Sequence, residues 1–132
     1  MDKGLVIING RKMETLLAIS EEEQSRGLMY VDPPAPNMAF LYGYPKINKF
    51  WMKNTKAPLD IVFANKNKIV SICSGKPYST EIIGDNRLSD LVVEFPAGTC
   101  NAYGIGIGDP IGLECSEGSL MKIFMLKNGF RI

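Results

Sequence analysis

The sequence predicts an α+β, β-rich fold: a small, mostly antiparallel barrel or half-barrel with one or two short helices. Three observations support this prediction. Short apolar runs recur along the chain, Gly, Pro and Asn separate them, and one segment carries a complete helix start signal. About nine or ten short strands are expected. The chain has 132 residues, so we expect a single domain that spans residues 1–132.

The N-terminal elements are predicted to be a hairpin followed by a helix. The first strand, its turn and the second strand are predicted at Leu5–Ile8, Asn9–Lys12 and Met13–Ile19. Ser20 then begins a helix of about two turns, because Glu23 three residues later completes a capping box. Gly27 is expected to end that helix.

The middle of the chain alternates strands with stiff or polar loops. The Pro-rich segment Val31–Asn37 predicts a rigid loop, and Asn65–Lys68 (NKNK) predicts a hairpin turn. The polar segment Ser74–Asp90 is expected to be irregular. The strands predicted in this region are Met38–Tyr42, Phe50–Asn54, Ile61–Ala64, Ile69–Cys73 and Leu91–Phe95.

The C-terminal third begins with a glycine-rich stretch. Ala97–Tyr103 predicts one or two helical turns that end at Gly104. The GIGIGD run that follows predicts tight turns rather than a phosphate-binding loop, because Pro110 comes next and no long helix does. A final strand pair is expected at Leu120–Leu126 and Phe130–Ile132, joined by the KNG turn.

Composition excludes several classes of function. The chain has no histidine, which excludes Ser-His-Asp and Cys-His catalysis and zinc sites built on histidine. The formal net charge is +1 and the basic residues are scattered, so neither nucleic acid nor a membrane is expected as a partner. The three cysteines fit no disulfide framework and suit a reducing compartment. Because the N-terminus has no signal-peptide core, a soluble, cytoplasmic protein is expected unless a targeting segment has been removed.

Six motifs occur in an order that resembles one protein family. They are RGLMY (Arg26–Tyr30), NMAFLY (Asn37–Tyr42), FWMKNT (Phe50–Thr55), PLDIVF (Pro58–Phe63), VVEFPAG (Val92–Gly98) and GIGIGD (Gly104–Asp109). Over roughly Met13–Ile111 the chain resembles the domain-of-unknown-function family 192. The resemblance implies a compact, barrel-like β-rich fold and a bacterial, archaeal or phage origin, with many relatives exported. It implies no biochemical activity.

The stretch FWMKNTKAPLD contains the only tryptophan of the chain and is the strongest candidate for a site. If Phe50–Asn54 is a strand, alternate side chains point to opposite faces. The predicted core face is Phe50, Met52 and Asn54, and the predicted site face is Trp51, Lys53 and Thr55. A Trp beside a Lys suits a shallow groove that has an apolar wall and a cationic tip.

Three charged residues complete the candidate ligand-binding set. Asp60 can pair with Lys53 across the turn or accept hydrogen bonds from backbone amides of that turn. Glu94 lies in the otherwise apolar run LVVEFP, where a carboxylate needs a partner such as Arg26 or Lys53. Each of these contacts could instead be structural, and Trp51 could simply cover the core. No metal site is predicted, because the acidic residues lack a metal-binding spacing. No cofactor is predicted either, and no catalytic residue is assigned.

The preferred interpretation is a small binding domain, a monomer or weak dimer, whose groove around FWMKNT accepts an acidic or aromatic small ligand or a peptide. One alternative is an enzyme, hydrolase-like or other, that uses Lys53 with Asp60 or Glu94 as an acid–base pair. Another alternative is an interaction module that packs on a larger assembly through an exposed apolar patch.

Overall fold

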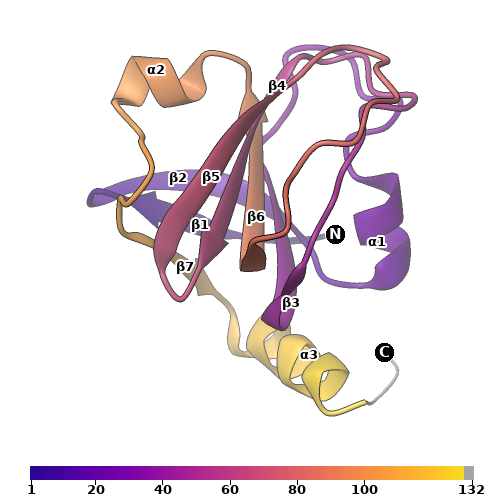
Figure 1. Cartoon of the computed structure of the whole chain (residues 1–132). Coiled ribbons are helices and arrows are strands. Elements are labelled where there is room, and N and C mark those ends of the chain that lie inside the picture. The colour runs from indigo at the N-terminus through magenta and orange to yellow at the C-terminus, as the bar shows by residue number, and fades with distance from the viewer. Residues whose placement is uncertain (130–132) are drawn as a thin grey trace.

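The protein forms a seven-stranded sheet that curls into a half-barrel, with three short helices at its margins (Figure 1). The computed structural model describes residues 1–129. In chain order the elements are β1 (Asp2–Ile8), β2 (Arg11–Ala18), α1 (Glu21–Arg26), β3 (Met38–Ile47), β4 (Leu59–Asn65), β5 (Lys68–Gly75), β6 (Leu88–Pro96), α2 (Thr99–Tyr103), β7 (Ile111–Cys115) and α3 (Glu117–Lys127).

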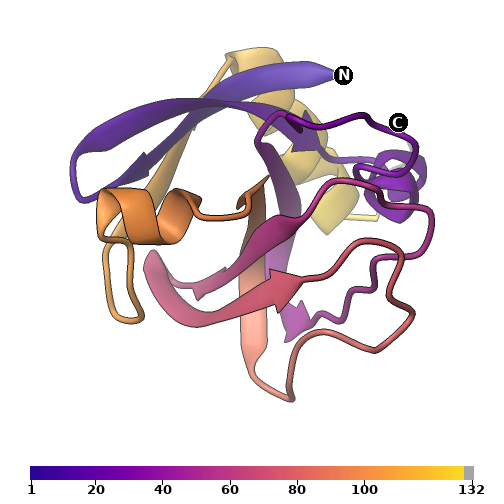
Figure 2. The same cartoon turned by 90° about the horizontal axis from the view of Figure 1, so that it is seen from above.

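The strand order in the sheet is β5-β4-β6-β3-β2-β1-β7. Neighbouring strands are antiparallel except β2 and β3, which run parallel, with Leu16 opposite Met38 and Ala18 opposite Phe40. Seen from above, the hairpins β1–β2 and β4–β5 form two arms of the curled sheet (Figure 2). The sheet is therefore mixed but mostly antiparallel, which confirms the predicted fold class.

Both hairpin turns predicted in the first half of the chain are confirmed. Asn9 and Gly10 join β1 to β2 with φ angles of 51° and 79°, and Lys66 and Asn67 join β4 to β5 with φ angles of 49° and 65°. Two consecutive residues with positive φ give a turn whose twist matches that of the flanking strands. Gly10 adopts this conformation without the steric cost that a side chain would add.

Helix α1 begins and ends where the sequence predicts. The Ser20 hydroxyl accepts a hydrogen bond from the Glu23 backbone N–H at 3.2 Å, and Glu23 Oε1 accepts one from the Ser20 N–H at 3.1 Å. These reciprocal bonds satisfy two N–H groups that the first turn would otherwise leave unpaired. Gly27 follows the helix with a φ of 51° and donates its N–H to the Glu23 carbonyl.

The central strands are buried on both faces, in two apolar clusters. On β6, Val92 belongs to the cluster that contains Met52, whereas Val93 and Phe95 belong to the other. Because side chains alternate along a strand, Glu94 points to the same face as Val92. The sequence thus places an acid inside the apolar layer of one sheet face.

The FWMKNT segment is not the strand that alternation predicts. Phe50 forms only an isolated antiparallel bridge with Ile83, and Lys53 and Asn54 form a turn in which Asn54 has a φ of 55°. Seven strands form within residues 1–129, where most of the nine or ten expected strands were predicted, and the loss of this strand is part of the difference. Pairing with a distant loop, rather than local β propensity, determines the backbone path here.

The prediction of a C-terminal strand at Leu120–Leu126 is also wrong, because this segment lies within helix α3. Ser116 precedes the helix, and its hydroxyl accepts a hydrogen bond from the Ser119 N–H at 3.1 Å, as an N-cap serine does. The expected partner strand Phe130–Ile132 lies outside the described residues. Strand β7 was not predicted, and it pairs antiparallel with β1 at one edge of the sheet.

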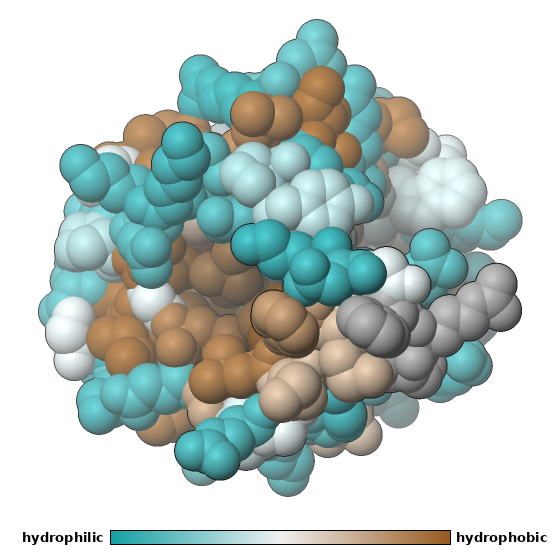
Figure 3. All heavy atoms as spheres, turned by 90° about the horizontal axis from the view of Figure 1, so that it is seen from below, coloured by the Kyte–Doolittle hydropathy of each residue, from teal (hydrophilic) through white to brown (hydrophobic). Residues whose placement is uncertain are grey.

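The end of the half-barrel beside α3 is apolar. A hollow of about 210 Å³ there has a lining that includes Leu41, Leu91 and Ile123. Figure 3, seen from below, shows apolar side chains gathered around a hollow on this face. Met121 and Phe124 of α3 are exposed. Within residues 1–129, no helix combines the length and the apolar character needed to cross a membrane.

Candidate functional site

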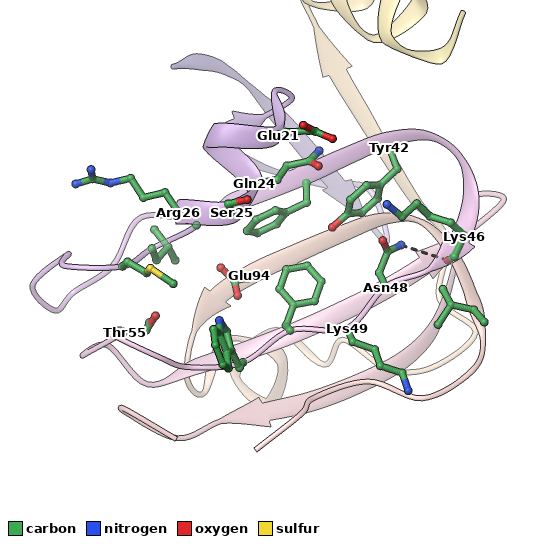
Figure 4. A pocket seen from close by; sticks show the side chains of 17 residues that line it. Glu21, Gln24, Ser25, Arg26, Tyr42, Lys46, Asn48, Lys49, Thr55 and Glu94 are labelled. Carbon is green, nitrogen blue, oxygen red and sulfur yellow. Dashed lines mark hydrogen bonds between the residues drawn. The ribbon is translucent and has the colours of Figure 1, made fainter. Parts of the chain in front are cut away.

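A pocket of about 580 Å³ lies between α1, the end of β3 and the FWMKNT segment, with Glu94 of β6 among its lining residues (Figure 4). Figure 4 shows Glu94 in the middle of the group, with Arg26 on one side and Asn48 and Lys49 on the other. The pocket is therefore built from four segments that are far apart in the sequence.

Helix α1 forms one wall and is fixed to the sheet by Gln24. The Gln24 side-chain amide donates hydrogen bonds to the carbonyls of Ala18 at 3.1 Å and Leu41 at 2.9 Å. Gly27, just after the helix, lies directly beside the buried acid: a methyl group there would be 3.9 Å from Glu94 Oε1. The absence of a side chain at Gly27 thus keeps space open above Glu94.

The second wall comes from the end of β3 and the residues after it. Lys46, Asn48 and Lys49 line the pocket from this side. The buried Asn48 amide donates hydrogen bonds to the Ser89 carbonyl at 2.9 Å and to the Ser89 hydroxyl at 2.8 Å. These bonds anchor the wall to β6 and leave the two lysines free to reach the mouth of the pocket.

The third wall is the FWMKNT segment, which long-range contacts hold in place. Phe50 exchanges two backbone hydrogen bonds with Ile83, and its ring packs edge-on against Phe40 with centroids 5.0 Å apart. Met52 is fully buried and donates its N–H to the Ser79 carbonyl. Burial of Phe50 and Met52 on the core side leaves Trp51 between them directed outward.

Trp51 and Thr55 both line the pocket, but not as members of one strand face. Trp51 is 44% exposed, whereas Thr55 is buried and donates its hydroxyl hydrogen to the Lys53 carbonyl at 3.1 Å. The Lys53–Asn54 turn lies between them. The predicted shared face of Trp51, Lys53 and Thr55 is therefore wrong, because the turn reverses the chain within the motif.

Lys53 does not line the pocket; its ammonium lies 5.1 Å from the centroid of the Trp51 ring. Within the part of the chain that the structure describes, Lys53 forms no ion pair. The expected Lys53–Asp60 pair is therefore wrong. A lysine held over an indole face gains a cation–π interaction of roughly 0.5–1 kcal/mol when exposed.

Asp60 lies outside the pocket and has a structural role. Its Oδ2 accepts hydrogen bonds from the backbone N–H groups of Gly98 at 3.1 Å and Cys100 at 3.0 Å. These hydrogen bonds hold the start of α2 in place. The amides belong to Gly98 and Cys100 and not to the turn that precedes Asp60, where they were expected from the sequence. Burial, with a further contribution from the negative charge of Asp60, raises the pKa of the Cys100 thiol to about 12, so this thiol stays protonated at neutral pH.

Glu94 is the only buried carboxylate among the described residues, with 4% of its surface exposed. In residues 1–129 its carboxyl has no hydrogen-bond or ion-pair partner, so the expected link to Arg26 or Lys53 is wrong. Burial raises the pKa of Glu94 to about 8, because an apolar environment disfavours the charged form. At neutral pH the group is mostly a neutral carboxylic acid that can both donate and accept a hydrogen bond.

Tyr42 and three cations, Arg26, Lys46 and Lys49, complete the site. Burial and the nearby Glu94 charge raise the pKa of the Tyr42 hydroxyl well above its usual value. Lys46 lies 5.1 Å from the Tyr42 ring centroid, and Arg26 lies 5.9 Å from the ring centroid of Tyr30. No group of three or more cysteine or acidic side chains in the described residues is placed to hold a metal ion.

Of the six candidate residues, the structure brings Arg26, Trp51, Thr55 and Glu94 to one pocket and leaves Lys53 and Asp60 outside it. Sequence reasoning missed several lining residues: Gln24, Tyr42, Lys46, Asn48 and Lys49. The available signal was the run KINK (Lys46–Lys49), which is separated by three residues from the apolar run Met38–Tyr42, because site residues often lie in the segments that connect strands.

The fold and this pocket define a β-rich half-barrel domain with a buried acid beneath an open cleft. The chain belongs to the DUF192 family, described as "Uncharacterized ACR", whose model matches residues 5–113. The family resemblance of the sequence is thereby confirmed. Helix α3 lies beyond the matched residues.

Several solved structures are similar to this chain, and two of them are described below. A protein from Sinorhizobium meliloti 1021, described as a proposed transcription regulator, is 30% identical with a TM-score of 0.75, over 84% of this chain and 92% of that chain. A protein of unknown function from Novosphingobium aromaticivorans DSM 12444 is 28% identical with a TM-score of 0.73, over 83% of each chain. Comparison with the curated proteins gives no match.

Proposed function

We propose that this chain is a small binding domain whose ligand occupies the pocket between α1, β3 and the FWMKNT segment. One observation carries the proposal. The buried carboxyl of Glu94 faces a pocket of about 580 Å³ and has no protein partner within residues 1–129. Within residues 1–129 the only fully buried side-chain oxygen or nitrogen without a partner is Asn65 Oδ1, so the Glu94 carboxyl is open to the pocket rather than sealed in the core. A largely buried polar group that no protein group pairs is a natural contact for a ligand.

The surroundings of Glu94 support an acidic or aromatic small ligand, or a peptide that carries such a group. Trp51 offers a flat, partly exposed surface against which a ring can stack. Arg26, Lys46 and Lys49 add positive charge to the lining. Most of the lining is polar or charged, with Phe40, Phe50 and Trp51 as aromatic contacts, so the pocket suits a polar or charged ligand that has a flat apolar part.

The enzyme alternative receives less support from the geometry. Its acid–base pair requires Lys53 and a carboxylate to converge in one cavity. Lys53 lies over the Trp51 ring outside the lining, and Asp60 is occupied by two backbone amides. Glu94 remains as a group with an elevated pKa, and the pKa of the nearby Tyr42 hydroxyl is raised well above its usual value, which makes that hydroxyl a poor proton donor at neutral pH.

Equilibrium dialysis against a small-molecule extract, followed by mass spectrometry, tests the proposal. We expect the wild-type protein to enrich one class of compound, and Trp51→Ala and Glu94→Ala to lose that enrichment at least tenfold. Tyr103→Ala is the matched control, because Tyr103 is an exposed aromatic residue on α2 that does not line the pocket. Equal enrichment by the wild type and both pocket variants would contradict the proposal.

A further inference from the structure

We propose that the ligand has two chemically different ends: an anionic group held at the mouth by Lys46 and Lys49, which lie on the same side of the pocket, and an uncharged hydroxyl or amide that hydrogen-bonds Glu94 on the floor. Between these ends we infer a planar body that lies against Trp51. This inference rests on the proposed function and names the class of compound that the same pocket would take.

The mouth carries positive charge that the protein does not neutralise. Within the described residues, the four ion pairs join Lys12, Lys56, Arg87 and Lys122 to acids elsewhere. None of the three lining cations forms such a pair, and Glu21 is the only other acid in the lining besides Glu94. Cations left without fixed partners around a cleft attract an anionic ligand and can bind it directly.

The positive charge lies at the rim rather than on the floor. Figure 4 shows Arg26 and Lys49 extending away from the centre of the pocket on different sides, whereas Glu94 lies between the walls. In agreement with this view, burial is the sole cause of the raised pKa of Glu94, and no lining cation lowers it. The charged and the neutral ends of a ligand would therefore occupy different depths.

The floor suits an uncharged polar group. A protonated carboxyl presents one donor and one acceptor, which is the complement of a hydroxyl or a primary amide. The Tyr42 hydroxyl is the other titratable group near Glu94, and it also stays neutral over the physiological pH range. An anion buried on this floor would lose its hydration without meeting a cation, and that loss is costly.

The body between the two ends is inferred to be flat. Trp51 lies between Phe50 and Met52, which are fixed by backbone hydrogen bonds to Ile83 and Ser79. Its ring is therefore held by an anchored backbone, and the Lys53 ammonium lies 5.1 Å from the ring centroid. A planar ligand can stack on such a ring, which is worth about 0.5–1.5 kcal/mol beyond the buried area.

Three small aromatic probes of similar size test the two ends of the proposed ligand separately. Para-hydroxyphenylpropionate carries both ends, phenylpropionate lacks the hydroxyl, and tyramine replaces the anion by a cation. Trp51 is the only tryptophan, so its fluorescence reports binding directly, and calorimetry provides a second readout. We expect para-hydroxyphenylpropionate to bind tightest, phenylpropionate about 3–10-fold more weakly and tyramine more than tenfold more weakly.

Variants of the protein test which pocket residues bind each end of the ligand. Lys46→Gln combined with Lys49→Gln should weaken para-hydroxyphenylpropionate about tenfold and leave tyramine unchanged or tighter. Lys66→Gln combined with Lys68→Gln is the matched control, because it removes two exposed positive charges outside the pocket. Glu94→Gln should keep the preference for the hydroxyl, since an amide also donates and accepts, whereas Glu94→Leu should abolish that preference.

Two outcomes would overturn these conclusions in different ways. If tyramine binds tightest and its binding still requires Trp51 and Glu94, the pocket is a binding site but the two-ended anionic ligand is wrong. If no probe, and no anionic, neutral or cationic aromatic fragment from a wider screen, binds in a way that depends on Trp51, the proposed function itself is wrong and this inference fails with it.

Discussion

Two carboxylates on neighbouring strands, Asp60 of β4 and Glu94 of β6, behave in opposite ways. Asp60 lies opposite Phe95 and Glu94 lies opposite Ile61, so the two acids are one row apart and point to opposite faces of the sheet. Asp60 accepts two backbone hydrogen bonds at the start of α2. Glu94 has no partner within the described residues and faces a pocket.

The two acids differ in their effect on the stability of the fold. Asp60 satisfies N–H groups that would otherwise be unpaired, so its charge stabilises the native state. Glu94 meets no such donor, so its charge is disfavoured and it remains protonated at neutral pH. We therefore assign a structural role to Asp60 and keep Glu94 as the centre of the proposed site.

The largest expected effect concerns the pH dependence of stability caused by Glu94. Its pKa is about 8 in the folded state, against an ordinary value of 4.5 in an unfolded chain. The folded state therefore binds this proton more tightly, and stability must fall as pH rises from about 4.5 to 8. We expect a loss of roughly 3–5 kcal/mol in the free energy of unfolding across this range.

Glu94→Gln is the control for this prediction, because a glutamine keeps the shape and cannot ionise. Urea unfolding of both proteins at several pH values gives the difference in their free energies of unfolding. That difference should change in favour of the glutamine variant as pH rises, and level off above pH 8. If the difference between the two free energies of unfolding stays constant between pH 5 and pH 8, ionisation of Glu94 does not destabilise the fold, and the proposed contrast with Asp60 is wrong.

A smaller effect is expected for Asp60→Ala. This change removes both hydrogen bonds to the start of α2 and should lower the free energy of unfolding by about 1–2 kcal/mol, because the site is only partly buried. Asp90→Ala is a matched comparison, since Asp90 is half-buried like Asp60 but accepts only one hydrogen bond, from the Lys66 N–H at 3.2 Å. If the two variants lose equal stability, Asp60 has no special structural role.

The smallest effect on stability is expected for Lys53→Ala. The side chain is exposed, forms no ion pair in residues 1–129 and contacts only the Trp51 ring among aromatic partners. We expect a change within about 0.5 kcal/mol in the free energy of unfolding, which is typical of surface substitutions. Thermal or urea unfolding measures it, and a loss above about 2 kcal/mol would mean that Lys53 has a buried partner.

Much of the fold could be predicted because its signals are local. The Asn9–Gly10 turn and the Ser20–Glu23 capping box need only neighbouring residues, and both formed as expected. The α3 helix was missed because its run LMKIFML is apolar at nearly every position and therefore lacks a clear period. The Ser116 cap and the lysine in its last turn were the signals that favoured a helix.

The candidate site was only partly predictable, because long-range contacts build it. Strand alternation failed in FWMKNT, where a turn at Lys53–Asn54 brings Thr55 back toward the interior. Glu94 was found because a charge inside an apolar strand is an anomaly at the level of sequence alone. Its lack of a partner depends on where α1 and β3 end, and no local pattern encodes that.

The most direct test of the account is the titration of Glu94 itself. Carbon-detected NMR of the glutamate side-chain carboxyls, with Glu94→Gln used to assign the Glu94 signal, follows its protonation between pH 4 and pH 10. The account predicts a midpoint near pH 8, the value that burial without a partner produces. A midpoint near 4.5 would mean that Glu94 is solvated or paired, and it would contradict the claim that an unpaired buried acid faces the pocket.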